Sequence, residues 1–228
     1  MLYTEAQVRD NIRNRDGKRV FYLGQGDQLR SDARDFLTRE RIEILPAREA
    51  RKERYEALDG GYFQEKPEHM THLNGEYLVK KNHPRIIFRG KMDSFQAEIL
   101  LSLQFCPQSR HELVEILEFS HSLLRDEVLE KPVEQKQLCG MTAEDLRHVS
   151  HFPQETYGIP HFMPSEEDSP EILWLNRLRC AARETELSAV DAFSDRDGNI
   201  TRPDLLKALN RMSSMLYILM IKRKAGRE

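Results

Sequence analysis

The sequence of 228 residues contains few cysteines, and they form no recognisable motif. Cys106, Cys139 and Cys180 lie far apart, and no Cys-x-x-Cys pair occurs. An odd and scattered set argues against a disulfide framework and against a cysteine-based zinc site. It is typical of proteins in a reducing compartment. We therefore expect a cytoplasmic protein without structural disulfides.

Long apolar runs and an excess of one charge are also missing. No run reaches the ~18 apolar residues that suggest a transmembrane helix, and residues 1–19 lack the apolar segment of a signal peptide. The formal net charge is −3, which gives no reason to expect nucleic acid or an anionic membrane as a partner. Any anion site must therefore be a local group of arginines and lysines.

Residues 1–65 predict a small α+β appendage followed by a charged linker. We expect a strand at 19–23, a helix at 29–41 and a second strand at 42–45. The charged stretch 46–69 is most simply a solvated helix that ends at Gly60-Gly61 and continues as a linker. This appendage is either a recruitment module, for a microcompartment or a reductase, or a structural addition.

Residues 66–228 predict a mainly α domain, an up-and-down bundle of about five helices. Thr142 to Asp145 resembles a capping box. Ser169 is a typical N-cap, and Pro170 suits the first helical position. The helices are expected at 92–105, 111–130, 142–152, 169–193 and 202–224.

Three charged residues interrupt the apolar pattern of the helix at 169–193. Arg179, Arg183 and Glu186 recur at the same three- and four-residue steps as the apolar positions. They are either ion pairs on a solvated edge or a polyanion site. Two guanidiniums one turn apart can each pair with phosphate oxygens, and the carboxylate one turn further along can hold them in place.

Two other stretches raise the same question. Asn210-Arg211 lies beside the apolar stripe of the last helix, where an asparagine is either simply exposed or part of a site. Residues 71–93 contain an Asn74-Gly75 turn and Pro84, which we expect to block a helix. A basic loop then leads to a helix start near Gly90 to Asp93 and is either a phosphate site or a solvated connection. The basic residues of this loop are Lys80, Lys81, Arg85, Arg89 and Lys91.

Together these stretches resemble the ATP:corrinoid adenosyltransferases of the ethanolamine-utilization type, which are related to those of the propanediol-utilization type. The likeness is carried by HMTHLNGEYLVKKNHPRIIFRGKMDS, LNRLRCAARETELSAV and ALNRMSSMLYILM. It covers about residues 66–224. Each motif is moderately specific, and their order along the chain makes the likeness strongly specific.

The resemblance implies a role for each matching residue. Thr71 and Lys81 correspond to the loop that holds the ATP triphosphate, and Asp93 to an acidic residue that pairs with the first arginine, Arg179. On the corrinoid side, His161 aligns with the residue that shields the lower face of the corrin. The residues implied to bind ATP are Thr71, Lys81, Arg179, Arg183, Glu186 and Asn210, with Arg179 and Arg183 as the catalytic pair.

The implied reaction transfers the 5′-deoxyadenosyl group of ATP to cob(I)alamin. Mg²⁺ is expected on the ATP phosphates, with no metal bound by the protein itself, because the chain lacks the cysteine cluster of metal-dependent relatives. A dry apolar pocket favours loss of the lower cobalt ligand. Tyr157, Phe162 and Met163 are the candidates for it, although they are equally expected to pack on the bundle.

The resemblance further implies partners and a location. We expect a homo-oligomer, with a trimer favoured and active sites between subunits, in the cytoplasm or with an ethanolamine-utilization microcompartment. The product would supply ethanolamine ammonia-lyase, and a flavoprotein or corrinoid reductase would supply Co(I). The alternative is a non-catalytic helical protein that binds nucleotide or corrinoid, or serves as a scaffold. Convergence of Lys81, Arg179, Arg183 and Asn210 on one cavity would favour the enzyme.

Overall fold

The chain divides into two compact units, Met1–Glu68 and His69–Glu228, in the computed structural model. We expected the division between residues 65 and 66. The structure describes residues 1–15, 17–47, 55–63, 65–75, 77–134 and 137–226. No described helix is long and apolar enough to cross a membrane.

The first unit begins with a small α/β fold. Phe21, Phe36 and Leu37 form its core together with Val8. The expected strands at 19–23 and 42–45 and the helix at 29–41 are confirmed, whereas the elements before residue 18 were not anticipated. Strand β1 is parallel to β4, β2 is antiparallel to β3, and β3 is parallel to β5. The elements are β1 (Leu2–Tyr3), α1 (Glu5–Asp10), β2 (Arg13–Arg15), β3 (Lys18–Leu23), β4 (Gln28–Leu29), α2 (Ser31–Arg39) and β5 (Glu43–Pro46).

A β-hairpin follows where the charge pattern predicted a solvated helix. Strands β6 (Tyr55–Ala57) and β7 (Tyr62–Phe63) are antiparallel. Gly60 has φ +90, a value that few other residues adopt, so it forms the turn. The helix prediction is therefore wrong from Tyr55 onward, because aromatic residues flanking a Gly-Gly turn favour a hairpin over a helix. The part of that predicted helix at 48–54 lies outside the described residues.

The second unit opens with another hairpin and continues as helices. Strands β8 (Met70–His72) and β9 (Tyr77–Lys80) are antiparallel, and the predicted Asn74-Gly75 turn joins them. Apart from α3, each predicted helix of this unit lies within two residues of its predicted bounds, and the short helix α6 was not predicted. The helices are α3 (Pro84–Ser102), α4 (Arg110–Val128), α5 (Ala143–His151), α6 (Pro153–Tyr157), α7 (Pro170–Phe193) and α8 (Pro203–Lys224).

The start of α3 corrects two expectations. Pro84 begins the helix instead of blocking it, because the first helical position needs no N–H donor and suits the fixed φ of proline. His83 is the N-cap, and its Nδ1 accepts the Arg85 N–H at 3.2 Å. Burial and the neighbouring arginines lower the pKa of His83, which keeps the imidazole neutral and able to accept this bond. Gly90 and Asp93 therefore lie inside the helix and not at its start.

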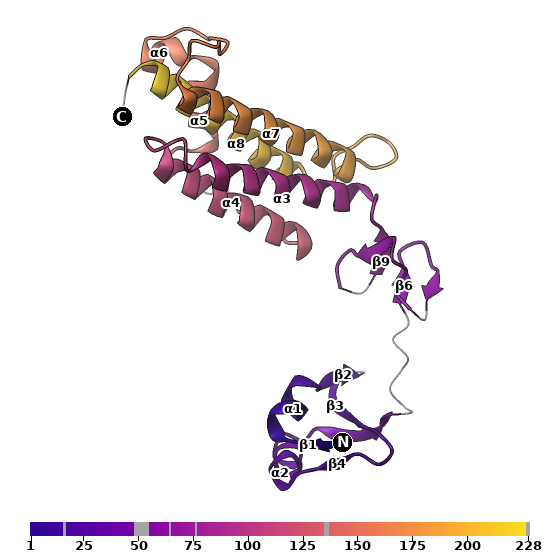
Figure 1. Cartoon of the computed structure of the whole chain (residues 1–228). Helices are drawn as coiled ribbons and strands as arrows, with labels where there is room; N and C mark the ends of the chain where they lie inside the picture. The colour runs from indigo at the N-terminus through magenta and orange to yellow at the C-terminus, as the bar shows by residue number, and fades with distance from the viewer. Residues whose placement is uncertain (16, 48–54, 64, 76, 135–136, 227–228) are drawn as a thin grey trace. The chain divides into compact units, whose positions relative to one another are not determined.

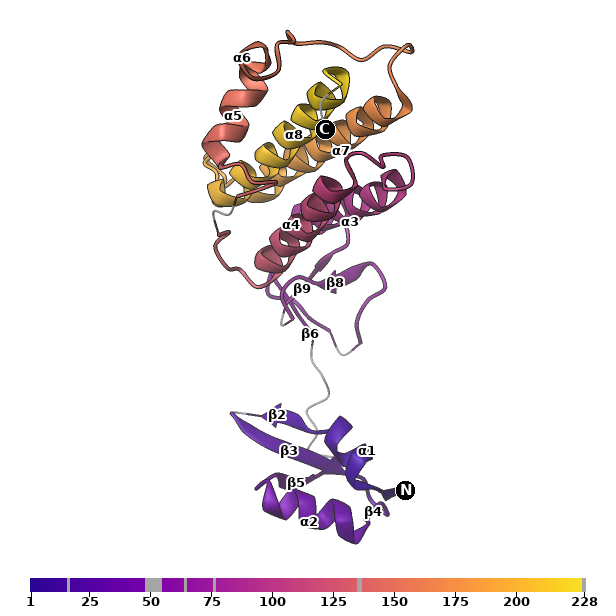
Figure 2. The same ribbon diagram turned by 90° about the vertical axis from the view of Figure 1, so that its left-hand side faces the viewer.

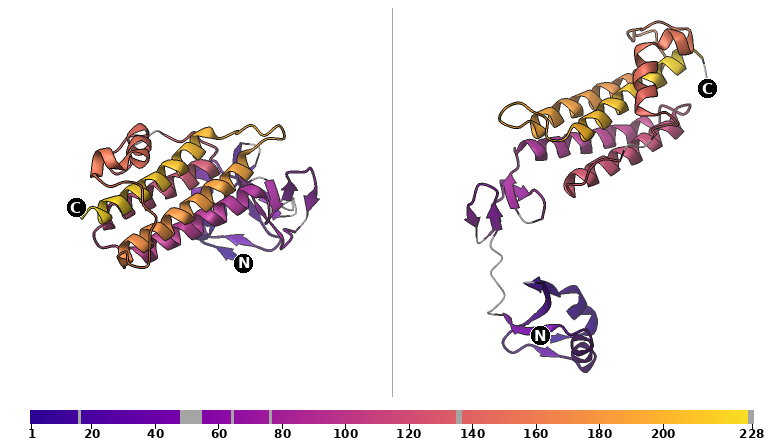
Figure 3. Two further views of the ribbon diagram at one scale, coloured as in Figure 1. Left: turned by 90° about the horizontal axis from the view of Figure 1, so that it is seen from above. Right: turned by 180° about the vertical axis from the view of Figure 1, so that it is seen from behind.

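Four long helices, α3, α4, α7 and α8, lie side by side and build the bundle (Figures 1 and 3). Ion pairs show that α3 and α7 run antiparallel: Arg177 bonds Glu98 at 2.7 Å, and Lys91 bonds Glu184 at 3.1 Å. Helix α5 packs beside α8, as Figure 2 shows. The expected mainly α fold with a small α+β appendage is confirmed.

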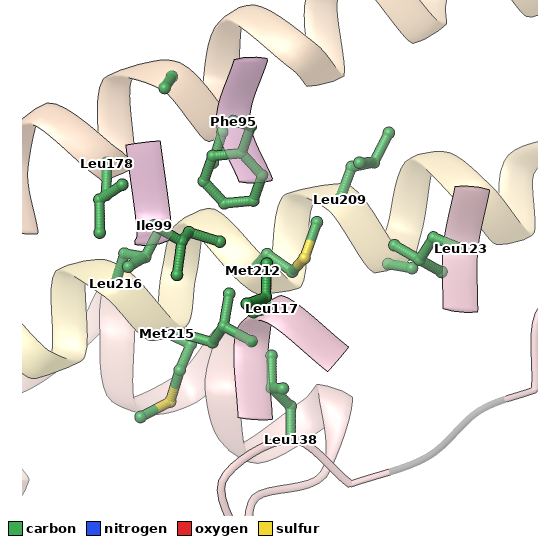
Figure 4. Close-up of a cluster of buried hydrophobic side chains, with 14 of the residues drawn as sticks. Phe95, Ile99, Leu117, Leu123, Leu138, Leu178, Leu209, Met212, Met215 and Leu216 are labelled. Carbon is green, nitrogen blue, oxygen red and sulfur yellow. The ribbon is translucent and has the colours of Figure 1, made fainter. Parts of the chain in front are cut away.

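The bundle core is apolar and closed. Each buried leucine or phenylalanine contributes about 1.5–3 kcal/mol relative to an exposed one. The apolar stripe of α8 is fully buried and consists of Leu205, Leu209, Met212, Leu216 and Leu219. The side chains labelled in Figure 4 are Phe95, Ile99, Leu117, Leu123, Leu138, Leu178, Leu209, Met212, Met215 and Leu216.

The helix caps fix where the helices begin. Thr142 forms a capping box with Asp145, as the sequence predicts, and the hydrogen bonds from Thr142 lower the pKa of that carboxyl. Ser169 accepts the Ile172 N–H at 3.4 Å, with Pro170 at the first position of α7. These caps fix the first turns of α5 and α7, and α7 carries Arg179 and Arg183.

Candidate functional site

A pocket of about 530 Å³ opens between α7, α8, the end of α5 and the segment that follows α6. This volume is in the usual range for small-molecule sites. It brings together predicted residues from three parts of the chain: Arg179 and Arg183, Asn210, and the 161–163 segment. The lining residues are Ser150, His151, His161, Phe162, Met163, Pro164, Arg179, Arg183, Asn210, Ser213, Ser214, Tyr217 and Met220.

The two arginines lie one turn apart on α7 and bond to no carboxylate among the residues that the structure describes. The Nε and Nη2 groups of Arg179 donate to Asn176 Oδ1 at 3.2 and 3.0 Å. Its Cζ lies 5.9 Å from the centre of the Tyr217 ring. Arg183 is exposed and forms no hydrogen bond or ion pair with any residue in the described ranges. The pocket wall therefore keeps positive charge, as a phosphate site requires.

Glu186 does not hold these arginines, contrary to one expectation. Its Oε1 accepts from Asn210 Nδ2 at 2.9 Å, and Asn210 Oδ1 accepts from Arg211 Nη2 at 2.7 Å. Burial, and then the charge of Arg147, lower the pKa of Arg211. Within the residues that the structure describes, Glu186 therefore forms no ion pair with Arg179 or Arg183, and the predicted ion pairs on a solvated helix edge are not formed. Glu186 instead orients the Asn210 amide.

The segment after α6 is tied to α8 by one aromatic residue. The Phe162 N–H donates to Tyr217 Oη at 3.3 Å, and His161 Nδ1 lies 3.0 Å from the same oxygen. His161 Nε2 lies 3.0 Å from the His151 carbonyl oxygen. The His161 and Tyr217 rings stack at 5.7 Å with planes 11° apart. This arrangement fixes Phe162 at the pocket, while Met163 is 85% exposed at its rim.

Helix α8 presents to the pocket a stripe of three polar residues and one methionine. Asn210, Ser213, Tyr217 and Met220 recur at three- and four-residue steps and all line the cavity. Only Asn210 was singled out beforehand. Tyr217 lies two turns from Asn210 on the same helix face, so helical spacing alone would have added it.

The arginines of the predicted basic loop have another role. Arg85 and Arg89 lie in the first turns of α3 and bond the fully buried Glu127 carboxylate of α4 at 2.7 and 2.6 Å. Burial alone would lower the pKa of Arg85, but hydrogen bonds with Glu130 and Glu127 raise it above its usual value. Their guanidiniums are therefore committed to holding two helices together, and neither expected role, phosphate site or solvated connection, applies to them.

Comparison with protein families matches residues 61–223 to the family described as cobalamin adenosyltransferase. The chain belongs to this family. The pocket lies within the matched residues, as does the bundle except for Lys224, the last residue of α8. The family expected from the motifs is thus confirmed.

Two curated relatives illustrate the similarity. The corrinoid adenosyltransferase EutT of Escherichia coli K12 is 34% identical over 157 residues, which cover 68% of this chain and 59% of that protein. The corrinoid adenosyltransferase EutT of Salmonella typhimurium LT2 is 32% identical over 157 residues, with the same shares. The chain spans less than two thirds of the length of these relatives.

Five of the predicted site residues of this family member do not line the pocket, and one of them is Glu186, which bonds Asn210. Thr71 and Lys81 belong to the β8–β9 hairpin and its end, and neither lines the cavity. Asp93 is exposed in the middle of α3, and Arg179 bonds Asn176 instead of Asp93. Tyr157, at the end of α6, packs against the bundle core. A single chain therefore brings together only part of the predicted site.

The family member offers no evident protein cage for a metal in its described part. No group of three or more His, Cys, Asp or Glu side chains is placed to hold an ion in the ranges that the structure describes. Burial raises the pKa of Cys106 and of Cys139 to about 12, so neither is a ready thiolate ligand. His148 lies 3.2 Å from Glu155, in an exposed pair on α5 and α6.

Proposed function

We propose that this protein transfers the 5′-deoxyadenosyl group of ATP to the cobalt of cob(I)alamin, giving adenosylcobalamin and triphosphate. The product would supply ethanolamine ammonia-lyase. One observation carries the proposal: Arg179, Arg183 and Asn210 share a single pocket with His161, Phe162 and Met163. Cationic and amide groups suited to a nucleotide thus lie beside apolar groups suited to a corrin.

The arginines account for the leaving group. In the reaction, a Co–C5′ bond forms while the C5′–O bond breaks, and the electron pair of that bond goes to the triphosphate. Negative charge therefore grows on the triphosphate in the transition state. Arg183 is unpaired among the described residues, and Arg179 keeps N–H groups beyond those bonded to Asn176, so both can donate to that charge.

The apolar segment accounts for the corrinoid side. Reduction to Co(I) requires loss of the lower cobalt ligand, which a water-excluding surface favours. Phe162 is partly buried against the core and lines the pocket, and Met163 extends from its rim. Both nitrogens of His161 already face partners, so its imidazole is not available to replace the lost ligand.

The remaining parts of the site complete the proposal. Thr71 and Lys81 do not line the pocket of their own chain, so we assign them to the pocket of a second copy in a homotrimer. Asp93 would pair with Arg179 across the same boundary. Mg²⁺ would be held by the nucleotide phosphates and water, which is its common mode of binding.

The test is a reaction of the purified full chain with ATP, Mg²⁺ and chemically reduced cob(I)alamin. The visible spectrum should change to that of a new Co–C bond, with one triphosphate released per product. Calorimetry with ATP alone completes the experiment. ATP binding without product would favour the alternative of a non-catalytic binding protein, and absence of both would overturn the proposed function.

A further inference from the structure

Tyr217 lies where the segment of residues 158–164 meets α7 and α8. It is partly buried, and its ring packs against the bundle core while its hydroxyl faces the pocket segment. Nothing in the motifs or in the predicted site assigns it a role. Five separate contacts nevertheless converge on it, two through the hydroxyl group and three through the ring.

The hydroxyl contacts define a directional chain of hydrogen bonds. The His151 carbonyl can only accept, so His161 Nε2 carries the proton and donates to it at 3.0 Å. In the neutral imidazole, Nδ1 then accepts from the Tyr217 hydroxyl at 3.0 Å. The same hydroxyl oxygen accepts the Phe162 N–H at 3.3 Å. The end of α5, His161, α8 and the backbone of Phe162 are thereby joined in one chain.

The ring contacts extend this connection to the arginine helix. The Tyr217 ring stacks with His161 at 5.7 Å and lies 6.3 Å from the Phe162 ring. The ring also forms a cation–π contact with the Arg179 guanidinium, whose Cζ lies 5.9 Å from the ring centre. One side chain therefore contacts both the group proposed to face the corrin and a group proposed to bind triphosphate.

We infer that Tyr217 is a positioning residue that sets the corrinoid-facing segment through its hydroxyl and the Arg179 guanidinium through its ring. The inference rests on the proposed function for the identity of the two ligands. The hydroxyl group would thus position the corrinoid-facing segment, and the ring would position the Arg179 guanidinium. Removal of the hydroxyl should therefore affect the corrinoid, and removal of the ring should affect ATP as well.

Two substitutions separate these tasks. Tyr217→Phe keeps the ring and removes both hydroxyl bonds, so the KM for cob(I)alamin should rise about 3- to 10-fold, the effect of about one net hydrogen bond. The KM for ATP should stay within about twofold. Tyr217→Leu should raise both KM values. Tyr22→Phe is the matched control, because Tyr22 belongs to strand β3 of the first unit and does not line the pocket, and it should change neither value.

Hydrogen exchange provides a readout that needs no turnover. The Phe162 amide should exchange faster in Tyr217→Phe than in the wild type, while amides in the middle of α8 stay equally protected. An unchanged corrinoid KM, an equal change in both KM values, or unchanged exchange at Phe162 would overturn the inference. A wild type that forms no product would refute the proposed function alone, because exchange at Phe162 would still decide the role of the hydroxyl.

Discussion

Two arginine pairs in this protein share a spacing and differ in what surrounds them. Arg85 and Arg89 on α3, like Arg179 and Arg183 on α7, are four residues apart and present two guanidiniums on one helix face. The first pair bonds the Glu127 carboxylate, which is 0% exposed. The second pair bonds no carboxylate in the described ranges and lines a pocket.

The difference shows that spacing alone does not give an arginine pair its function. A buried carboxylate neutralises the α3 pair and makes it a connection between helices. Without such a partner, the α7 pair remains a source of positive potential for an anionic ligand. The comparison can be tested by removing the carboxylate from one pair and an arginine from the other.

The largest expected effect is on stability. Glu127→Ala should lower the free energy of unfolding by about 3–5 kcal/mol, because it leaves two largely buried guanidiniums without their carboxylate. Denaturant titration measures this. Glu130→Ala is the matched control, since Glu130 bonds the same Arg85 at 3.0 Å but is 56% exposed at its side chain. The control should cost less than about 1 kcal/mol, and equal costs would contradict the structural role of Glu127.

The second expected effect is on turnover without loss of stability. Arg183→Ala should lower kcat on the order of 10²–10³-fold, as removal of one transition-state donor does in other sites. Its melting temperature should stay at the wild-type value, because Arg183 has no partner among the described residues to lose.

Arg177→Ala is the matched control for this change. Arg177 lies on the same helix, but its Nη2 bonds Glu98 of α3 at 2.7 Å and it does not line the pocket. The control should keep turnover within about twofold, because Arg177 does not line the pocket. Loss of its surface ion pair should lower the free energy of unfolding by only about 0.2–1 kcal/mol. Equal activity of Arg183→Ala and the wild type would remove the distinction between the two arginine pairs.

The smallest expected effect concerns a carboxylate–arginine pair of intermediate burial. Hydrogen bonds from Arg202, aided by the Val133 N–H, lower the pKa of Asp204 from 3.8 to about 2. Because the folded-state pKa lies below the unfolded one, this stabilisation is present above about pH 4 and is lost as the pH falls towards 2. Asp204→Asn should thus cost about 2 kcal/mol at pH 7.

The pH dependence of that cost is the critical readout. Unfolding titrations of the wild type and Asp204→Asn at pH 7 and pH 3 should show a difference that shrinks by about half at the lower pH. A difference that stays constant between these values would show that the ionised carboxylate is not what stabilises this corner of the bundle.

Much of the bundle was predictable from residue patterns, and the exceptions have physical reasons. Helices α7 and α8 were predicted to within a residue because their apolar stripes are long and proline marks each first turn. The start of α3 was misjudged because proline breaks a helix at an interior position but is favoured at the first helical position, where Pro84 lies. The hairpin at Tyr55 was missed because charge periodicity outweighed the β propensity of its aromatic residues.

The site was less predictable than the fold, since it depends on partners distant in sequence. The spacing of Arg179 and Arg183 indicated a phosphate site, but nothing local distinguishes them from Arg85 and Arg89. Their difference depends on Glu127, which lies on another helix. Tyr217 was overlooked because it adjoins the apolar stripe of α8. The proposed place of Thr71 and Lys81 at the pocket of a second copy depends on assembly, which a single sequence does not encode locally.

The central claim is that the α7 arginine pair binds the triphosphate of the nucleotide. The most direct measurement is calorimetric binding of inorganic triphosphate with Mg²⁺ to the full chain, without corrinoid. We expect Arg183→Ala to bind at least about tenfold more weakly than the wild type, because a charged hydrogen bond contributes about 1.5–3 kcal/mol, and Arg177→Ala to bind equally well. Wild-type affinity in Arg183→Ala, or an equal loss in both variants, would contradict it.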